Sequence, residues 1–191
     1  MDDEYKRKKR KLRQNLLRRR SSLPKDVFLQ KSACIHSRLQ SLSEYEKASV
    51  IHCYVSMNKR REVNTHPLIK QMLANGKKVV VPITQMETGT LTHVRLHSFD
   101  DLKENTWGVL EPVGGEQIEI DALELVIVPM AGGDRQKNRI GYGKGFYDRF
   151  LDEVECPTIG LTFEECMVEE IPTEPFDVPL GAVITENNTI S

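Results

Sequence analysis

The stretch that decides the fold is PMAGGDRQKNRIGYGKGFYDR, residues 129–149. It holds five of the chain's 12 glycines, with basic residues between them. An apolar run, LVIV at 125–128, comes directly before it, and a helix-like run at 146–154 follows. A strand, a glycine-rich loop and a helix start in this order are typical of phosphate sites, because glycine lets backbone N–H groups approach an anion closely. The stretch therefore predicts an anion-binding loop after a buried strand.

Apolar runs alternate with helical patterns along the rest of the chain. Strands are expected at 50–55, 78–81, 90–97, 123–129, 158–163 and 182–185, and helices at 4–22, 25–42, 65–75 and 146–154. The run at 123–129 is apolar on both faces, as central parallel strands are. We predict an α/β fold with three layers (α/β/α), a doubly wound, mostly parallel sheet and a helical, basic N-terminus. A length of 191 residues fits one domain, 1–191, in which helices at 1–42 pack on an α/β body at 50–191.

Several finer expectations follow from local patterns. The strand at 78–81 should end at Pro82, and the strand at 182–185 should be the last. His93 and His97 should be surface residues that lie too far apart on their strand to bind one metal ion. Trp107, the only tryptophan, fits a core plug as well as a ligand-stacking residue. The helix at 25–42 should bury Val27, Phe28, Ala33, Ile35 and Leu39.

Composition excludes several classes of protein. Apolar residues make up 39% of the chain and charged residues 29%, which is ordinary for a soluble globular protein. No apolar run approaches the length of a membrane span, and the charged N-terminus does not fit a secretory signal, so we expect the cytoplasm and no membrane. The four cysteines are far apart, which favours reduced structural thiols. No exposed apolar stripe is evident, so a monomer is expected.

The charge is unevenly distributed. Residues 1–20 carry ten Lys/Arg against three acids, and the remaining residues carry 17 against 25, which gives +7 and −8. The basic arm fits a solvated helix face, a nucleic-acid or targeting patch, or a clamp for ligand phosphates. Lys9 and Arg13 are four residues apart and project from one helix face. Only Tyr5 supplies an interleaved aromatic, so nucleic acid ranks below the other two interpretations.

The loop itself does not match the common nucleotide motifs. GYGKG at 141–145 is neither the P-loop pattern nor the Rossmann pattern, and alone it fits a flexible turn equally well. Arg139 and Lys144 are suited to phosphate oxygens. Asp148 lies in the first turn of the next helix, where it could complement the helix N-terminus or bind Mg2+ beside substrate phosphates.

With its neighbours, the loop resembles the 5-formyltetrahydrofolate cyclo-ligase family, also called 5,10-methenyltetrahydrofolate synthetase. The family's long glycine-rich signature stands here as NRIGYGKGFYDR, residues 138–149. Three further segments are similar in order and spacing: Lys9-x-x-Leu12-Arg13 near the N-terminus, EVNT at 62–65, and FDVP at 176–179. The chain departs from the family pattern before Asp134 and at Asn64, Phe146 and Phe176.

The resemblance implies an ATP- and Mg2+-dependent enzyme that converts 5-formyltetrahydrofolate to 5,10-methenyltetrahydrofolate, ADP and phosphate, through phosphorylation of the formyl oxygen. It implies Lys144 and Arg139 as catalytic residues and Asp148 and Asp177 as Mg2+ ligands. The ATP site would be Lys9, Arg10, Lys11, Leu12, Arg13, Arg139, Ile140, Gly141, Tyr142, Gly143, Lys144, Gly145, Phe146 and Tyr147. The folate site would be Met57, Glu62, Trp107, Tyr142, Gly143, Lys144, Gly145 and Phe146.

Two other classes remain open. A sugar-phosphate isomerase or CoA-transferase relative would use the basic loop for phosphate without ATP, and Glu111 is its candidate base. An RNA-associated protein would use residues 6–20 on a degenerate enzyme fold, although the intact run at 139–148 argues against degeneration.

Overall fold

The computed structural model describes residues 2–191 and contains a seven-stranded sheet in the order β11-β10-β9-β6-β1-β2-β3. Its strands are β1 Val50–Cys53, β2 Lys78–Gln85, β3 Thr90–Leu96, β6 Leu125–Pro129, β9 Thr158–Leu161, β10 Ala182–Ile184 and β11 Thr189–Ile190. The five strands from β10 to β2 run parallel, and β3 and β11 are antiparallel at the two edges. The predicted doubly wound, mostly parallel sheet is confirmed.

The strand before the glycine-rich loop occupies the middle of this sheet. Every residue of β6 from Leu125 to Val128 is buried, because helices cover both faces. The helices are α1 Asp2–Ser21, α2 Lys25–Gln40, α3 Ser43–Lys47, α4 His66–Ala74 and α5 Phe146–Asp152, and the short 3-10 turns are η1 Asn58–Arg60, η2 Phe99–Asp101, η3 Ile120–Ala122 and η4 Glu164–Cys166.

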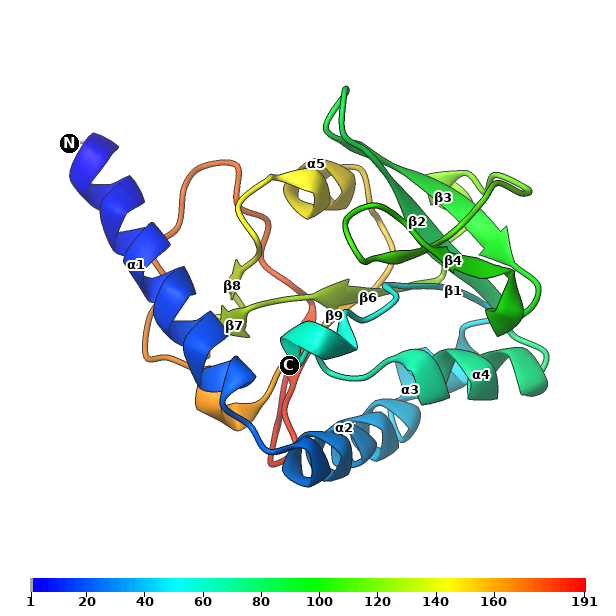
Figure 1. Ribbon diagram of the computed structural model, residues 1–191, viewed down its shortest axis with the longest axis horizontal. Coiled ribbons are helices and arrows are strands. Elements are labelled where there is room, and N and C mark those ends of the chain that lie inside the picture. The colour runs from blue at the N-terminus through cyan, green and yellow to red at the C-terminus, as the bar shows by residue number, and fades with distance from the viewer. Residues whose placement is uncertain (1) are drawn as a thin grey trace.

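Two cores lie on opposite faces of the sheet. Phe28 and Ile35 of α2 and Leu68 of α4 pack in one core, whereas Phe150 and Leu151 of α5 pack in the other. Figure 1 shows α2 and α4 below the sheet and α5 above it. The three-layer architecture was therefore predictable from the alternation of strands and helices.

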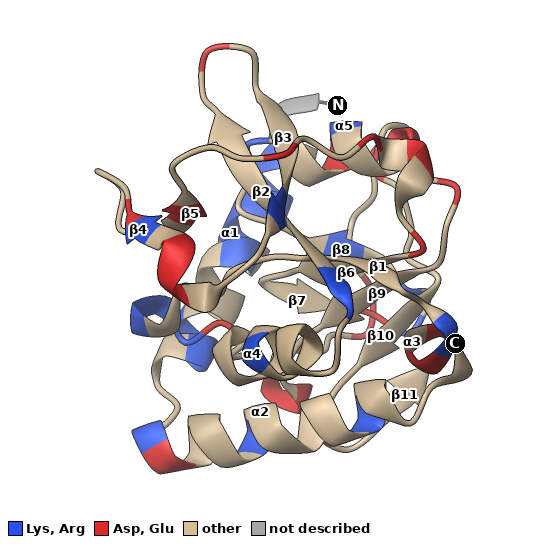
Figure 2. Ribbon diagram, turned by 90° about the vertical axis from the view of Figure 1, so that its right-hand side faces the viewer, with Lys and Arg blue, Asp and Glu red and all other residues tan. Residues whose placement is uncertain are grey.

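The basic helix α1 stands beside these layers. Leu16 of α1 packs on Ala131 and Ile140, which follow the end of β6, and on Cys166 of η4. Lys and Arg recur along this helix (Figure 2). Its apolar side fixes it against the glycine-rich loop, and its basic residues are thereby brought to the carboxyl end of the sheet.

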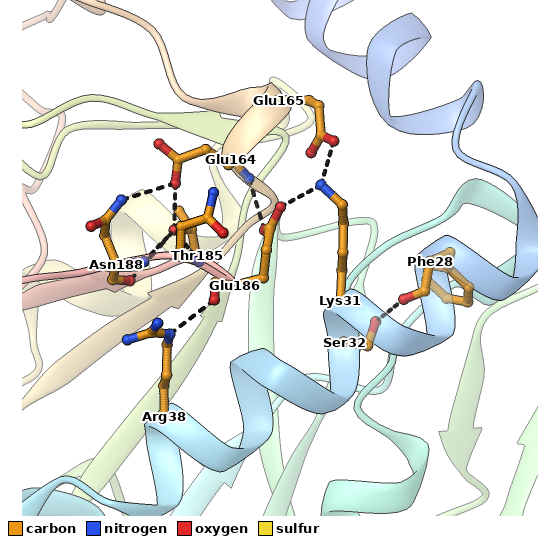
Figure 3. A network of polar contacts seen from close by, with 10 residues as sticks. Phe28, Lys31, Ser32, Arg38, Glu164, Glu165, Thr185, Glu186 and Asn188 are labelled. Carbon is orange, nitrogen blue, oxygen red and sulfur yellow. Dashed lines mark hydrogen bonds and ion pairs between the residues drawn. The ribbon is translucent and has the colours of Figure 1, made fainter.

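A polar network outside the cores holds the segment on which α1 rests. Lys31 of α2 pairs with Glu165 of η4 and with Glu186, and the Arg38 Nε donates to the Glu186 carbonyl oxygen over 2.9 Å (Figure 3). Glu186 also accepts the backbone N–H of Glu164 over 3.0 Å. The network joins α2, η4 and the β10–β11 turn, so it supports α1 from below.

Three strand predictions were wrong. The second strand, β2, continues through Pro82 to Gln85, because pairing with β1 stops at Val80 and proline is tolerated on the open edge beyond it. The strand β10 is followed by β11 and is not the last. Two small hairpins are also additional: β4 Leu102–Glu104 with β5 Leu110–Pro112, and β7 Gly132–Gly133 with β8 Arg139–Ile140.

Two burial predictions also failed. Ala33 is exposed, and Ser32 is buried in its place, because its hydroxyl donates to the Phe28 carbonyl and accepts the N–H of Asn64. His93 is buried rather than on the surface, since α5 brings Phe150 over β3 and its ring packs on the imidazole. The four cysteines are free thiols, as predicted. Among residues 2–191, none of the helices combines the length and the apolar character that a membrane span requires.

Candidate functional site

A cavity of about 480 Å³ opens at the carboxyl ends of the parallel strands. Ligands of open α/β sheets bind at this edge. Its walls come from α1, from the segments after β1 and β6, from the β2–β3 hairpin with β5, and from the loop before β10. The lining residues are Lys6, Lys9, Arg13, Tyr54, Val55, Met57, Glu62, Pro82, Thr84, Leu91, Val109, Leu110, Glu111, Pro129, Arg139, Gly141, Tyr142, Gly143, Lys144, Gly145, Phe146, Tyr147, Asp148, Glu174, Phe176 and Asp177.

The glycine-rich loop forms one wall and requires its glycines. Gly143 and Gly145 have φ angles of 84° and 72°, a region that residues with a Cβ avoid. A Cβ at Gly143 would also lie 3.0 Å from the guanidinium carbon of Arg13. The Nε of that arginine donates to the Gly141 carbonyl oxygen over 2.7 Å. The loop and α1 are thus in direct contact, although far apart in the sequence.

Lys9 extends the contact between α1 and the cavity. Its side chain is buried, with 8% of the residue exposed, and its ammonium pairs with Asp177 and, over 3.3 Å, with Glu174. The structure therefore brings Lys9 and Arg13 to the same cavity, in agreement with their spacing on one helix face. It does not bring the whole predicted run there: Arg10 and Lys11 are exposed outside the wall, and Leu12 packs beside Leu16.

Arg139 and Asp148 form an ion pair at the floor of the cavity. Arg139 Nη2 donates to Asp148, and Nη1 donates to the Val178 carbonyl oxygen over 2.6 Å. Burial lowers the pKa of Arg139, and the carboxylates of Asp148 and Asp177 partly offset that effect. Ile140, which the family resemblance places in the ATP site, does not line the cavity. It is buried behind the cavity wall, where it packs with Leu16.

The two predicted metal ligands, Asp148 and Asp177, both line the cavity and are each paired with a cation. Within residues 2–191 no group of three His, Cys, Asp or Glu residues is close enough to form a metal site. Mg2+ is commonly held by one or two carboxylates together with substrate phosphates. The arrangement fits an ion that arrives with a phosphate ligand, and does not fit a site built by the protein alone.

Glu62 provides a carboxylate on the cavity wall formed by the segment after β1. It is buried, its Oε2 accepts the Met57 N–H over 2.6 Å, and its Oε1 accepts the Tyr142 hydroxyl proton. Burial, together with the charge of Glu62, raises the pKa of Tyr142, so the hydroxyl keeps the proton that it donates. A carboxylate has about four acceptor positions, so it can also receive hydrogen bonds from a ligand.

Apolar side chains complete the cavity and include residues that the sequence did not indicate. Leu91, Val109 and Leu110 line it from the β2–β3 and β4–β5 hairpins, and Phe176 lines it from the loop before β10. Their exposure to the cavity depends on hairpin placement, for which the sequence holds no local signal. Tyr147 lines the cavity as predicted, and burial raises the pKa of its hydroxyl.

Trp107 is the predicted folate-site residue that the structure does not bring to the cavity. It is 68% exposed in the turn between β4 and β5 and lies outside the wall. The side-chain oxygen of Asn105 accepts the backbone N–H groups of Trp107 and Val109 and so closes the turn. Trp107 is therefore neither a core plug nor a wall residue in this structure.

The cavity thus joins a basic wall to an apolar compartment with one buried carboxylate. Lys9, Arg13 and Lys144 face it from α1 and the glycine-rich loop, and Glu62 faces it from the segment after β1. An elongated ligand with an anionic part and a flat, hydrogen-bonding part fits this division.

Comparisons with known proteins identify relatives of the whole chain. Residues 5–186 match the model of the 5-formyltetrahydrofolate cyclo-ligase family. The mouse 5-formyltetrahydrofolate cyclo-ligase is 29% identical over 196 residues, covering 96% of each chain, and the Escherichia coli K12 enzyme is 32% identical over 130 residues, covering 65% of this chain and 71% of its own. The solution structure of Aquifex aeolicus 5,10-methenyltetrahydrofolate synthetase superposes with a TM-score of 0.84 at 29% identity, covering 95% of this chain and 91% of that one.

Proposed function

The chain belongs to the 5-formyltetrahydrofolate cyclo-ligase family, and we propose that its cavity closes 5-formyltetrahydrofolate to 5,10-methenyltetrahydrofolate with consumption of Mg-ATP and release of ADP and phosphate. The observation that best supports the use of ATP is the contact of α1 with the glycine-rich loop, where Arg13 donates to the Gly141 carbonyl oxygen. That contact gathers basic side chains from two distant segments along one wall, as a triphosphate requires.

The chemistry explains why a phosphate donor is needed. The formamide oxygen would have to leave as oxide, which is a very poor leaving group. In the proposed reaction this oxygen attacks the γ-phosphorus and ADP departs. N10 of the folate then attacks the activated carbon and loses its proton, and the C–O bond breaks to release phosphate. Such a reaction depends on positioning and charge neutralisation and needs no covalent enzyme nucleophile.

We assign the triphosphate to the basic wall. Lys9, Arg13 and the backbone of residues 141–145 would hold it, with Lys144 nearest the transferred phosphoryl group. Lys144 is exposed at the cavity, which leaves its ammonium able to reach a ligand. Arg139 is buried against Asp148, so its contribution to phosphate binding would be mainly to hold that carboxylate and the loop in place.

Mg2+ would bind between the nucleotide phosphates and the carboxylates of Asp148 and Asp177, and would neutralise charge on the phosphate oxygens. Both carboxylates border the wall to which the triphosphate is assigned. Their present cation partners would have to share them with the metal. This ties binding of the metal to binding of the nucleotide.

The folate ring would occupy the apolar compartment. The pterin presents adjacent N–H donors, and Glu62 can accept from them because it has two oxygens. Met57, Phe146 and Tyr147 line the same cavity and would contact the ring faces. The position of Trp107 outside the wall gives no support to a direct role in folate binding.

The isomerase or transferase alternative receives no support from Glu111. Both of its carboxylate oxygens are engaged, by the Thr84 N–H over 3.0 Å and by the Asn105 side-chain amide over 2.9 Å. Glu111 therefore fastens the β4–β5 hairpin to β2, and this structural role accounts for its carboxylate without a catalytic one.

The proposal is tested by mixing the purified protein with 5-formyltetrahydrofolate and Mg-ATP and following methenyltetrahydrofolate by its absorbance. Product should form with one ADP per turnover, and omission of ATP or addition of excess EDTA should stop it. Failure to form product under these conditions, with folate binding intact, would contradict the proposal.

A further inference from the structure

Arg20 is the most deeply buried charged side chain at the edge of the cavity, and nothing above assigns it a role. It lies in the last turn of α1 with 2% of its surface exposed. Burying a guanidinium is costly unless hydrogen bonds and a nearby anion compensate it. The contacts that provide this compensation show what the residue does.

Each bond from Arg20 reaches a different segment of the cavity wall. Nε donates to the Arg60 carbonyl oxygen over 3.0 Å, Nη1 donates to the Met130 carbonyl oxygen over 3.2 Å, and Nη2 donates to the Tyr142 hydroxyl over 2.5 Å. These acceptors belong to the segment after β1, to the residue that follows β6 and to the glycine-rich loop. A single planar guanidinium thus fixes three segments relative to one another.

The compensating anion is Glu62, reached through a hydroxyl. The Tyr142 oxygen accepts from Arg20 and donates its proton to Glu62 Oε1, so arginine and glutamate form an ion pair bridged by tyrosine. The Arg20 and Arg60 guanidinium carbons also lie 5.5 and 5.9 Å from the centre of the Tyr142 ring, so two cations lie close to this ring.

The backbone beside Glu62 is strained, and Arg20 holds it. Arg61 has φ 54° and ψ 36°, the left-handed conformation that side chains disfavour. The residue before it is bonded to Arg20 through its carbonyl, and the Arg61 guanidinium lies 5.2 Å from the centre of the Phe28 ring. Such strain persists where neighbouring contacts determine the conformation, and here it directs the next residue, Glu62, into the cavity.

We propose that Arg20, acting through Tyr142, is a positioning residue that orients the Glu62 carboxylate toward the bound pterin. The inference rests on the proposed function, because it takes Glu62 as the acceptor for the pterin N–H donors. Arg20 itself touches neither substrate. Its effect is to leave one side of each Glu62 oxygen for the ligand, since Tyr142 and the Met57 N–H occupy the other sides.

The decisive variant is Tyr142→Phe, which removes the bridging oxygen and keeps the aromatic ring close to the two guanidinium groups. We expect the KM for 5-formyltetrahydrofolate to rise about tenfold, the effect of losing one charge-assisted hydrogen bond. The KM for ATP should rise much less than the KM for folate, because the exchange removes one hydroxyl and keeps the loop backbone, Lys9, Arg13 and Lys144. Direct titration of 5-formyltetrahydrofolate without ATP should show the same loss of affinity.

A second set of variants separates positioning from structure. Arg20→Met should raise the KM for folate as Tyr142→Phe does, and it should also lower Tm, because the Arg60 and Met130 carbonyl oxygens lose their donor. Adding Tyr142→Phe to Glu62→Gln should weaken folate binding no further. The exposed Arg18 on the same helix supplies the matched control, and Arg18→Met should behave as the unchanged protein. If Arg20→Met fails to fold, Tyr142→Phe with Arg20→Lys decides the question.

The outcomes are distinguishable. An inactive parent protein contradicts the proposed function itself. An active parent whose Tyr142→Phe variant keeps its folate KM contradicts the positioning role, as does a variant in which the KM for ATP rises as much as the KM for folate. Additive losses in the Glu62→Gln background would also contradict it, because they would show that Arg20 and Tyr142 act independently of Glu62.

Discussion

The Arg139–Asp148 ion pair offers the sharpest test of how the cavity is built. The Arg139 side chain is 4% exposed and the Asp148 side chain 28% exposed. Asp148→Asn removes the negative charge with almost no change in volume. The guanidinium then keeps its bond to the Val178 carbonyl oxygen and loses the carboxylate beside it.

The structure gives the size of the effect. Removing one partner of a buried ion pair costs about 3–5 kcal/mol, because the other charge stays buried without compensation. Asp148 is partly exposed and the asparagine oxygen can still accept a bond, so we expect a loss of about 2–3 kcal/mol, below that range. For a chain of this size 1 kcal/mol corresponds to about 2–4 °C in Tm, so Tm should fall by about 4–12 °C.

The assay is thermal unfolding followed by circular dichroism in the absence of nucleotide and Mg2+. Asp152→Asn is the matched control, because Asp152 lies exposed in the same helix, and it should move Tm by no more than about 1 °C. The double variant Arg139→Met with Asp148→Asn should lose less stability than the two single losses added together.

A different result would refute the reasoning. If Asp148 acts only as a metal ligand, Asp148→Asn should leave the Tm of the metal-free protein unchanged and raise only the Mg2+ concentration needed for activity. An unchanged Tm in the absence of metal would therefore show that the ion pair contributes nothing to the fold. A fall in Tm together with a higher Mg2+ requirement would give the carboxylate both roles.

Further perturbations probe other parts of the molecule. Lys144→Ala should lower kcat at least about a hundredfold with an unchanged Tm, the usual cost of removing one group that stabilises transition-state charge; single-turnover absorbance measurements check this, and a near-normal rate would contradict its role in phosphoryl transfer. Gly143→Ala should raise the KM for ATP, because its Cβ would crowd Arg13. The control is Gly76→Ala, which has a similar φ of 76° and open space around it, and which should lower stability without changing the KM. Parallel kinetic and denaturation measurements check both results. Burial lowers the pKa of His52 well below 6.5, so the unfolded chain takes up the proton first and stability falls as the pH drops below 6.5, by at most about 1.4 kcal/mol per pH unit. His52→Leu should remove that contribution, so the urea midpoint of the variant should differ less between pH 7 and pH 5 than that of the parent protein. An equal difference in the two proteins would contradict the assignment.

The sequence predicted the centre of the fold better than its periphery, for a physical reason. β6 is apolar on both faces, and only a strand covered by helices on both sides satisfies that pattern. Edge elements carry weaker constraints: Pro82 stands inside β2 because its neighbour β1 has already ended. The burial of His93 is similarly invisible in its own strand, since it results from α5 packing over it.

The site shows the same division. The glycine pattern at 141–145 predicted a loop at the cavity, because positive φ angles require glycine at 143 and 145. Trp107 could not be placed, since a single aromatic residue in a turn carries no signal of whether it faces the cavity or the solvent. The role of Tyr142 could not be predicted either, because it depends on a hydrogen bond to Glu62, which is 80 residues away in the sequence.

The sequence of the basic helix α1 nevertheless indicates, by its spacing alone, which of its cations face the rest of the protein. Lys9, Arg13, Leu16 and Arg20 follow one another at intervals of four, three and four residues, so they share one face of the helix. Leu16 is fully buried, and a cation on the same face must therefore either leave that face or meet acceptors from other segments. All three cations meet such acceptors: Lys9 at Asp177 and Glu174, Arg13 at Gly141, and Arg20 at Tyr142. Arg10, Lys11 and Arg18 lie off that face and are exposed. In a highly basic helix, the cations in register with a buried leucine are therefore the ones to examine for function.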